Sequence, residues 1–258
     1  MCTVTWLSCP GGYELYMNRD ERHTRGTALP PQIHSRGTVE PVRFLAPVDP
    51  DAGGTWIAAN ELGLTVCLLN HYPGRPPAEP TSYESRGALV MQLVVAHGAD
   101  AVDRMLGGTD LHSYRPFTLL VVEPDRAPCL RRWNGYGAIE SDDDPQPPIT
   151  SSSFDQDAVV AARRAAYAAI AGNDPTSEAL LKYHASHVPE AGAYSVCAHR
   201  EDGGTKSLCR VATGPREIAM HYRPGPPCEG AGASVRVLTR LRTPERGFPP
   251  SERDSSRH

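Results

Sequence analysis

The chain begins MCTVTWLSCPGGYELYMNRDER, residues 1–22, and this stretch decides the first predicted feature of the fold. Two runs rich in β-branched and aromatic residues, 3–7 and 13–17, flank Pro10-Gly11-Gly12. Such runs on either side of a short glycine turn are typical of an antiparallel hairpin. A hairpin folds the end of its second strand back beside the start of its first. Residues 18–21 are therefore predicted to lie close in space to Cys2, at the start of the first strand.

Cys2 carries two useful groups if Met1 is removed, namely a thiol and a free α-amine. An α-amine has a reference pKa of about 8 and a thiol about 8.5, so moving a proton from sulfur to nitrogen costs only about 0.7 kcal/mol. One residue could then supply both nucleophile and base. The alternative interpretation is a free cysteine that acts as a small buried hydrophobic side chain.

The remaining pattern groups helices together instead of alternating them singly with strands. Such grouping favours an α+β fold in which helices cover antiparallel sheets over a doubly wound parallel sheet. We expect a single domain over residues 1–240 and a disordered tail over 241–258. The predicted elements are strands at 55–59, 64–69, 117–123, 128–133, 193–199, 205–212 and 217–222, helices at 83–106 (with a break at Gly98), 155–171 and 175–187, a loop at 23–41 and a disordered segment at 141–148.

Composition excludes several classes of function. The formal net charge is −4, which leaves no broad basic field for binding nucleic acid. The longest apolar stretch, near residues 87–96, is much shorter than the roughly 20 residues of a membrane-spanning helix, and no secretion signal is visible. The seven cysteines form no Cys-x-x-Cys pair. We therefore expect a cytoplasmic protein without membrane insertion; its oligomeric state is left open.

Several motifs together resemble the NRDE family, also called the TANGO2 (transport and Golgi organisation 2) family. The resemblance covers roughly residues 1–125, and residues 194–200 and 205–208 are similar to a segment in the last third of bacterial members. It implies an N-terminal-nucleophile (Ntn) hydrolase-like fold, a four-layer αββα sandwich with two antiparallel sheets face to face and helices outside. The motifs are MCTVTW (1–6), NRDE (18–21), DPDAGGTW (49–56), Leu69-Asn70 and Ser85-Arg86-Gly87.

The chain has four candidate catalytic residues, of which Cys2 takes its role from the resemblance and the other three from their charge or position. Cys2 would attack an amide or thioester carbonyl and form an acyl-enzyme, as in an Ntn cysteine hydrolase or acyltransferase. Arg19 near the sulfur would favour the thiolate, and Asp20 near the amine would favour the ammonium; an ion pair that only closes the strand is the alternative. Asn70, at a strand end, would stabilise the oxyanion.

Six further residues are candidate substrate contacts. Adjacent residues of a strand point to opposite sides, and the sequence does not decide which alternate pair of residues 18–21 faces the site. The alternative for Asn60 is a role in its turn, and the alternative for Trp56 is a place in the core. His199 and Arg200 would form the far wall of the pocket. The six are Asn18, Glu21, Trp56, Asn60, His199 and Arg200.

A metal site can be drawn from His184, His187, Cys197 and His199, because imidazole and thiolate are zinc ligands. The spacing is not a recognised zinc pattern, so the sequence favours no metal and no cofactor. Cys228, in Pro226-Pro227-Cys228, is interpreted as part of a rigid turn. Whether the protein is an enzyme is also open: the rival function is a non-catalytic carrier of haem or acyl-CoA, a role to which the family has been linked. Its partner is therefore either a small acyl substrate or such a ligand.

Overall fold

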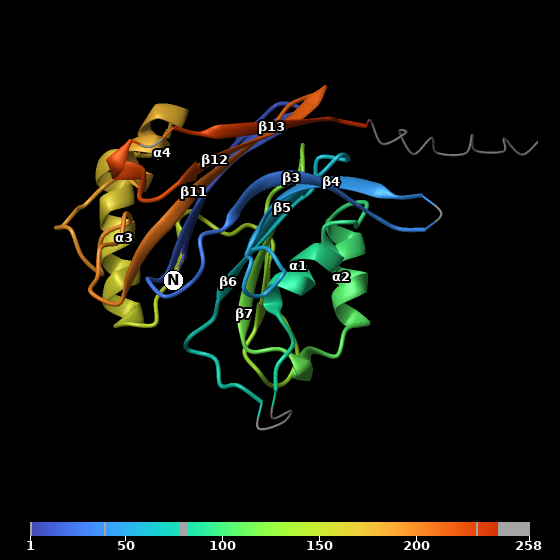
Figure 1. Ribbon diagram of the computed structural model, residues 1–258, viewed down its shortest axis with the longest axis horizontal. Coiled ribbons are helices and arrows are strands. Elements are labelled where there is room, and N and C mark those ends of the chain that lie inside the picture. Colours follow the sequence, from blue (N-terminus) through green and yellow to red (C-terminus); the bar gives the residue numbers. More distant parts are fainter. Residues whose placement is uncertain (1, 39, 78–81, 231, 242–258) are drawn as a thin grey trace, which may run out of the picture.

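Two antiparallel sheets pack face to face, with a pair of helices outside each, in the computed structural model (Figure 1). The structure describes residues 2–38, 40–77, 82–230 and 232–241. In spatial order, the first sheet consists of β10 (Ile149–Ser151), β1 (Cys2–Cys9), β2 (Gly12–Arg22), β11 (Gly203–Thr213), β12 (Glu217–Pro224) and β13 (Ser234–Thr239). The second consists of β3 (Leu29–Arg36), β4 (Val42–Val48), β5 (Ile57–Asn60), β6 (Thr65–Asn70), β7 (Phe117–Val122), β8 (Cys129–Trp133) and β9 (Glu140–Asp142).

The predicted N-terminal hairpin is present as β1 and β2, and it sets Cys2 directly opposite Arg19. The sequence predicted that residues 18–21 lie just past the end of the second strand. They lie within β2 instead. They stay extended because β11 pairs with the other side of β2 as far as Arg22. Cys2 also pairs with Ser151 of β10, so the start of β1 has a strand on each side.

The apolar side chains of the chain separate into layers that follow strand alternation. In β1, Val4 and Trp6 face the second sheet, where they join Leu45 and Ile57 in the inter-sheet core. The intervening Thr3 and Thr5 are buried on the opposite side, toward the helices. This alternation leaves the helix side of β1 lined by hydroxyl groups, which matter for the site.

Helices cover the outer face of each sheet. α1 (Arg86–Leu93) and α2 (Ala99–Gly107) pack on the second sheet, while α3 (Gln156–Ile170) and α4 (Ser177–His184) cover the first (Figure 1). The predicted break at Gly98 is confirmed, because this residue has a φ of 142° between the first two helices. Two 3-10 turns, Leu111–Ser113 and Pro227–Glu229, complete the described elements.

Three further local predictions were wrong. The expected loop at 23–41 contains β3, where two prolines are tolerated because β3 lies at the edge of its sheet. Residues 193–199 form a loop instead of a strand, with only an isolated bridge at His199. The segment at 141–148 is ordered and leads from β9 into β10.

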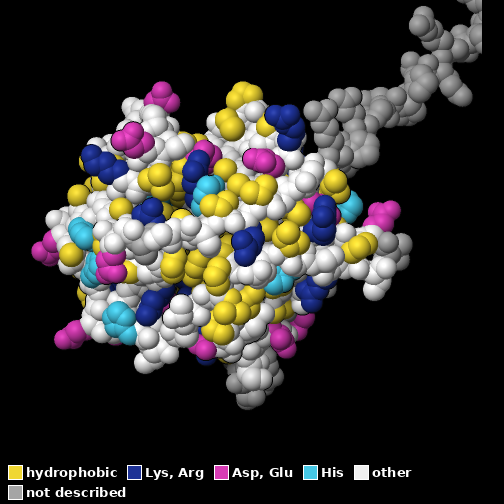
Figure 2. Space-filling view, turned by 45° about the horizontal axis from the view of Figure 1, so that its top comes forward, with side chains coloured by type: hydrophobic (Ala, Val, Ile, Leu, Met, Phe, Trp, Pro, Cys, Tyr) yellow, Lys and Arg dark blue, Asp and Glu magenta, His cyan; other side chains and the backbone are white. Residues whose placement is uncertain are grey.

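The surface near β3 and β13 carries exposed aliphatic side chains, among them Ile33 and Val237. Figure 2, which turns the upper side of Figure 1 toward the viewer, shows hydrophobic groups with positively charged side chains between them. Within the described ranges, the structure contains no helix long and apolar enough to cross a membrane. Of the predicted tail, only Leu241 lies within the described residues.

Candidate active site

A cleft of about 620 Å³ gathers most of the predicted catalytic and binding residues. It is bounded by the start of β1, the end of β2, the 49–56 turn, the end of β6 and the start of α1. Six of the ten predicted residues lie on its wall: Cys2, Arg19, Asp20, Glu21, Trp56 and Asn70. The cleft therefore joins motifs that are spread over residues 2–87 of the sequence.

Arg19 is held in place by contacts on three sides. Its Nη2 donates to Asp49 Oδ2 at 2.6 Å, its guanidinium carbon lies 4.6 Å from the centroid of the Trp56 ring, and Glu21 Oε2 is 3.8 Å away. Arg25 Nε donates to the same Asp49 oxygen at 3.0 Å. Burial alone would raise the pKa of Asp49, but the hydrogen bond from Arg25 and the charges of both arginines hold it below its ordinary value.

Asp20 points the other way, into a buried polar network. Its Oδ1 accepts a 2.7 Å hydrogen bond from Thr205 Oγ1, and its Oδ2 lies 3.3 Å from both terminal nitrogens of Arg163. Arg163, from α3, is fully buried and also donates to Thr3 Oγ1 at 2.6 Å. The Asp20 charge is thus fixed at the floor of the cleft by a cation from the helix layer.

The electrostatic surroundings of Cys2 act in opposite directions. Burial raises the pKa of the Cys2 thiol, and the Asp20 carboxylate adds to the rise. The hydrogen bond from the Asp20 backbone and the Arg19 guanidinium act to lower it. Cys2 is therefore a thiol whose ionisation depends on charges supplied by its neighbours on β2.

The opposite wall of the cleft is rich in arginine. Arg86, at the first position of α1, donates to Pro116 O, and Arg115 stacks over the Tyr83 ring at 4.9 Å. Among the described residues, neither Arg86 nor Arg115 has a carboxylate oxygen within 4.0 Å. Asn70, nearby, donates to Tyr72 OH at 2.9 Å. The wall thus offers cationic groups and an amide to a ligand.

Two glycines let the 49–56 turn reach α1. Thr55 N donates to Gly87 O at 3.2 Å, and a Cβ atom on Gly54 would lie 2.5 Å from the backbone carbon of Gly87. No side chain fits in that gap. The glycines of two separate sequence motifs are therefore explained by one backbone contact that closes the cleft.

Four predicted binding residues lie outside this cleft. Asn18 faces the helices, where its Nδ2 donates to His184 O and Val196 O, because it alternates with Arg19 along β2. Asn60 is buried in its own turn and donates to Val94 O and Ala96 O. His199 and Arg200 line a different cavity and do not form the predicted far wall.

His184 and His187, which the sequence places on one helical face, have different surroundings. The buried His184 accepts from Thr5 Oγ1 through Nε2 at 2.8 Å and donates through Nδ1 to Asn18 Oδ1 at 3.1 Å. The tautomer follows from Asn18, whose amide nitrogen is already directed at two carbonyls. Burial lowers the pKa of His184 to about 3, so this residue is a neutral bracket between β1 and β2.

Sequence reasoning missed Arg163 and Asp49 as site residues. Arg163 lies in an alanine-rich helix that carries a second arginine, Arg164, and nothing in that pattern distinguishes the buried one. Asp49 opens the DPDAGGTW motif, and its position beside a glycine turn suggested only a turn residue.

Comparison with known proteins identifies the motif-bearing half of the chain. A family model described as Transport and Golgi organisation 2 (TANGO2) matches residues 1–149, which is more than half of the sequence. The matched part contains Cys2, the NRDE block and the turn that packs against α1. No curated protein matches the chain.

Solved structures match nearly the whole length. Penicillin V acylase from Agrobacterium tumefaciens superposes with a TM-score of 0.54 at 11% identity, covering 93% of this chain and 86% of its own. Two variants of the conjugated bile acid hydrolase from Clostridium perfringens each give a TM-score of 0.56 at 10% identity, with 94% and 97% covered. These neighbours are Ntn-hydrolase-like, so the predicted fold is confirmed.

Proposed function

The chain belongs to the TANGO2 family, and on this basis we propose that it cleaves or transfers an acyl group from an amide or thioester through Cys2. The observation that carries the proposal is the position of this thiol at the start of β1, opposite Arg19 and inside the charged cleft. The named activities of the structural neighbours, an acylase and a hydrolase of conjugated bile acids, agree with this class of reaction.

The proposed reaction begins with the Cys2 thiolate and its own α-ammonium, so it requires removal of Met1. The sulfur attacks the acyl carbonyl carbon, the bond from carbon to the leaving nitrogen or sulfur breaks, and the ammonium gives its proton to the leaving group. Water then attacks the acyl-cysteine thioester, one of its protons goes to the amine and the other stays in the carboxylic acid. The carbon–sulfur bond breaks, so that the acid leaves and Cys2 returns to its thiolate and α-ammonium form. Another acceptor in place of water would make the protein an acyltransferase.

Neighbouring residues supply the electrostatics of these steps. Arg19 stabilises the thiolate, and Asp20 stabilises the ammonium while Arg163 offsets its charge. Asn70 is the proposed donor to the developing oxyanion. To bind it, the Asn70 amide gives up its hydrogen bond to Tyr72 OH. Asp49 fixes the Arg19 guanidinium through its 2.6 Å hydrogen bond.

The arginine-rich opposite wall of the cleft suggests the charge of the substrate. Arg86 and Arg115 project from the opposite side of the cleft, and guanidinium groups pair well with carboxylate or phosphate. We therefore propose an acyl compound that also carries an anionic group, such as an N-acyl amino acid. We also propose the cytoplasm as the compartment, because all seven cysteines are free thiols.

The test uses protein whose intact mass shows that Met1 has been removed. We expect one substrate from a panel of N-acyl amino acids, penicillin V, conjugated bile acids and acyl-CoAs to leave an acyl adduct on Cys2. Cys2→Ser and Cys2→Ala should lose turnover, whereas the matched control Cys9→Ser, at an exposed free thiol, should retain it. Turnover that survives in Cys2→Ala, or a native chain that keeps Met1, would contradict the mechanism.

The rival function is a carrier for acyl-CoA or haem. Arg86 and Arg115 of the opposite wall favour a carrier of acyl-CoA, because guanidinium groups pair well with the phosphates of coenzyme A. Tight binding of an acyl-CoA that is released chemically unchanged, with equal affinity in Cys2→Ala, would favour the carrier. Binding that is followed by loss of the thioester would favour the enzyme.

A further inference from the structure

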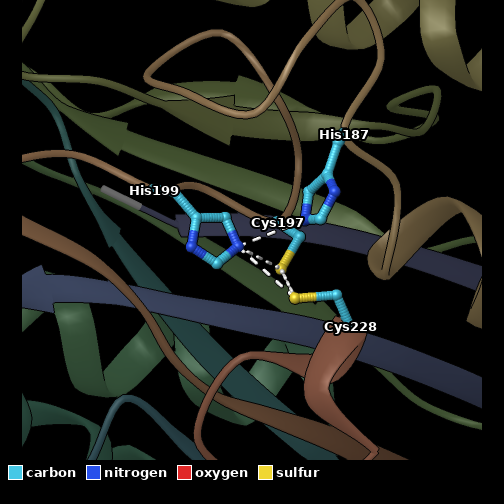
Figure 3. Close-up of side chains that lie close together, drawn as sticks. All are labelled: His187, Cys197, His199 and Cys228. Atoms are coloured by element: carbon cyan, nitrogen blue, oxygen red, sulfur yellow. Dashed lines mark hydrogen bonds between the residues drawn. The ribbon is translucent and has the colours of Figure 1, made fainter.

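Four side chains outside the cleft converge on one point. They are His187, Cys197, His199 and Cys228, whose donor atoms all lie within 4.8 Å of one another (Figure 3). His187 follows α4, Cys197 and His199 belong to the loop before β11, and Cys228 lies in the 3-10 turn after β12. Three separate segments of the chain thus direct zinc-type ligands to the same place.

Four of the six separations between the donor atoms are close to the edges of a coordination tetrahedron, and the other two, from His187 to the sulfurs, lie within 4.8 Å. The two Nε2 atoms of the histidines are 3.1 Å apart, and the two sulfurs are 3.5 Å apart. His199 Nε2 lies 3.6 Å from Cys197 Sγ and 3.4 Å from Cys228 Sγ. An ideal zinc site, with Zn–S of about 2.3 Å and Zn–N of about 2.05 Å, gives edges of about 3.8 Å (S–S), 3.6 Å (S–N) and 3.3 Å (N–N).

The backbone around these ligands is already fixed. Cys197 N donates to Ser186 O at 3.1 Å, and Cys197 O accepts from Ser195 Oγ at 2.7 Å. His199 N donates to Gly192 O at 3.1 Å. The ligand-bearing loop therefore has its shape without a metal, so that binding an ion does not require the loop to fold first.

We propose that His187, Cys197, His199 and Cys228 form a structural Zn²⁺ site. Two thiolates and two neutral imidazoles neutralise the ion and fill all four tetrahedral positions, which leaves none for substrate or water. Binding releases the two thiol protons. Cys197 is buried and His187 exposed, so the ion can enter from solvent.

The set differs from the one that the sequence suggested. His184 is excluded because both of its ring nitrogens are used between Thr5 and Asn18. Cys228 takes the fourth position, 29 residues after His199 in the chain. The 3-10 turn Pro227–Glu229 brings it there, and Arg223 Nη1 donates to Pro227 O at 3.2 Å.

The site would brace the loop that supports the cleft. Val196 O accepts from Asn18, and Ala198 N donates to Thr205 Oγ1, the same hydroxyl that donates to Asp20. A metal ion bound at residues 197 and 199 would therefore fix the backbone beside Asn18 and the hydroxyl that binds Asp20. Its expected effect is on stability and not on the chemical step.

The experiment compares reduced, chelator-stripped protein with variants of two ligands and one control. Full-length wild type that is reloaded with Zn²⁺ should retain one ion per chain after gel filtration. Reloading with Co²⁺ should produce thiolate charge-transfer absorption and the intense visible bands of tetrahedral coordination. Cys228→Ser and His187→Gln should weaken Zn²⁺ binding by at least about 100-fold. Cys9→Ser, at an exposed cysteine outside the cluster, should bind as the wild type does.

Three outcomes would overturn the proposal. One is substoichiometric Zn²⁺ and Co²⁺ binding by reduced wild type. Another is equal binding by the ligand variants and Cys9→Ser, with circular dichroism showing that all are folded. The third is a disulfide between Cys197 and Cys228 in freshly isolated protein, which would mean that their 3.5 Å separation serves an oxidised pair.

Discussion

Cys2 and Cys197 both lie next to β2, yet their surroundings prepare them for different chemistry. Cys2 is paired with Arg19 on the cleft wall, and its ionisation is set by burial, by full charges and by a backbone hydrogen bond. Cys197 is in contact with a second sulfur and an imidazole. The difference teaches that the neighbouring atoms, and not the cysteine itself, decide between a nucleophile and a metal ligand.

The most direct way to break this comparison is to remove each sulfur separately. Cys2→Ala should lower kcat/KM by at least about 1,000-fold, since it removes the bond-forming atom, and should leave the thermal midpoint unchanged. Cys228→Ser should do the opposite, lowering the thermal midpoint of the zinc-loaded protein with little effect on kcat. Steady-state kinetics and calorimetry on both variants test the division of roles, and a matched loss of activity in the two variants would refute it.

Charge burial beneath the cleft gives the next largest effect. Arg163→Met should destabilise the fold by about 3–5 kcal/mol, because it leaves the buried Asp20 carboxylate without its cation. Arg200→Met, at an exposed pair with Asp202, should cost less than about 1 kcal/mol. Urea denaturation measures both. If the two variants are equally stable, the Asp20 charge does not depend on Arg163.

The backbone contact that closes the cleft can be tested by one methyl group. Gly54→Ala should cost about 1–3 kcal/mol and lower activity, because its Cβ would overlap the backbone of Gly87. Gly107→Ala, in α2 with no atom within 4 Å of the added Cβ, should be neutral or slightly stabilising. Equal midpoints in urea for the two variants would show that the turn can move away from α1 at no cost.

His184, which is hydrogen-bonded to both β1 and β2, gives the smallest effect. Its pKa is about 3 in the folded chain, against about 6.5 when unfolded. Below pH 6.5 the unfolded chain therefore binds a proton that the folded chain does not, and the free energy of unfolding falls as the pH falls. The expected loss from pH 7 to 5.5 is about 1.3 kcal/mol.

Urea titrations at the two pH values check this expectation. His184→Gln should lose about 1.3 kcal/mol less than wild type over the same interval, while the exposed His112→Gln should follow the wild type. An identical pH dependence in wild type and His184→Gln would mean that the pKa of His184 in the folded protein is not lowered.

Local sequence signals predicted the parts of the fold that depend on local contacts. The glycine turn at residues 10–12 predicted the first hairpin, and Gly98 predicted the break between α1 and α2. The strand β3 was missed because two prolines normally interrupt a strand, and only its position at a sheet edge makes them acceptable. Edge positions follow from the order of strands in space, which a single sequence does not contain.

The candidate site was predictable where the hairpin set the NRDE block opposite Cys2 and where motifs contained Trp56 and Asn70. Arg163 reaches Asp20 from a helix that begins more than 130 residues later, and Cys228 reaches Cys197 across two strands. No periodicity links such positions. His199 and Arg200 were assigned to the wrong pocket because sequence proximity to strand residues does not reveal which side a loop faces.

The two-sided pairing of β1 also sets an order of events during synthesis. Residues 149–151 must leave the ribosome before Cys2 gains its second neighbouring strand, which takes roughly 7 to 30 s at 5–20 residues per second. Until then Cys2 has one neighbouring strand at most. The short strand β10 therefore completes the pairing of β1 only after more than half of the chain has been made, long after β2 can form the hairpin.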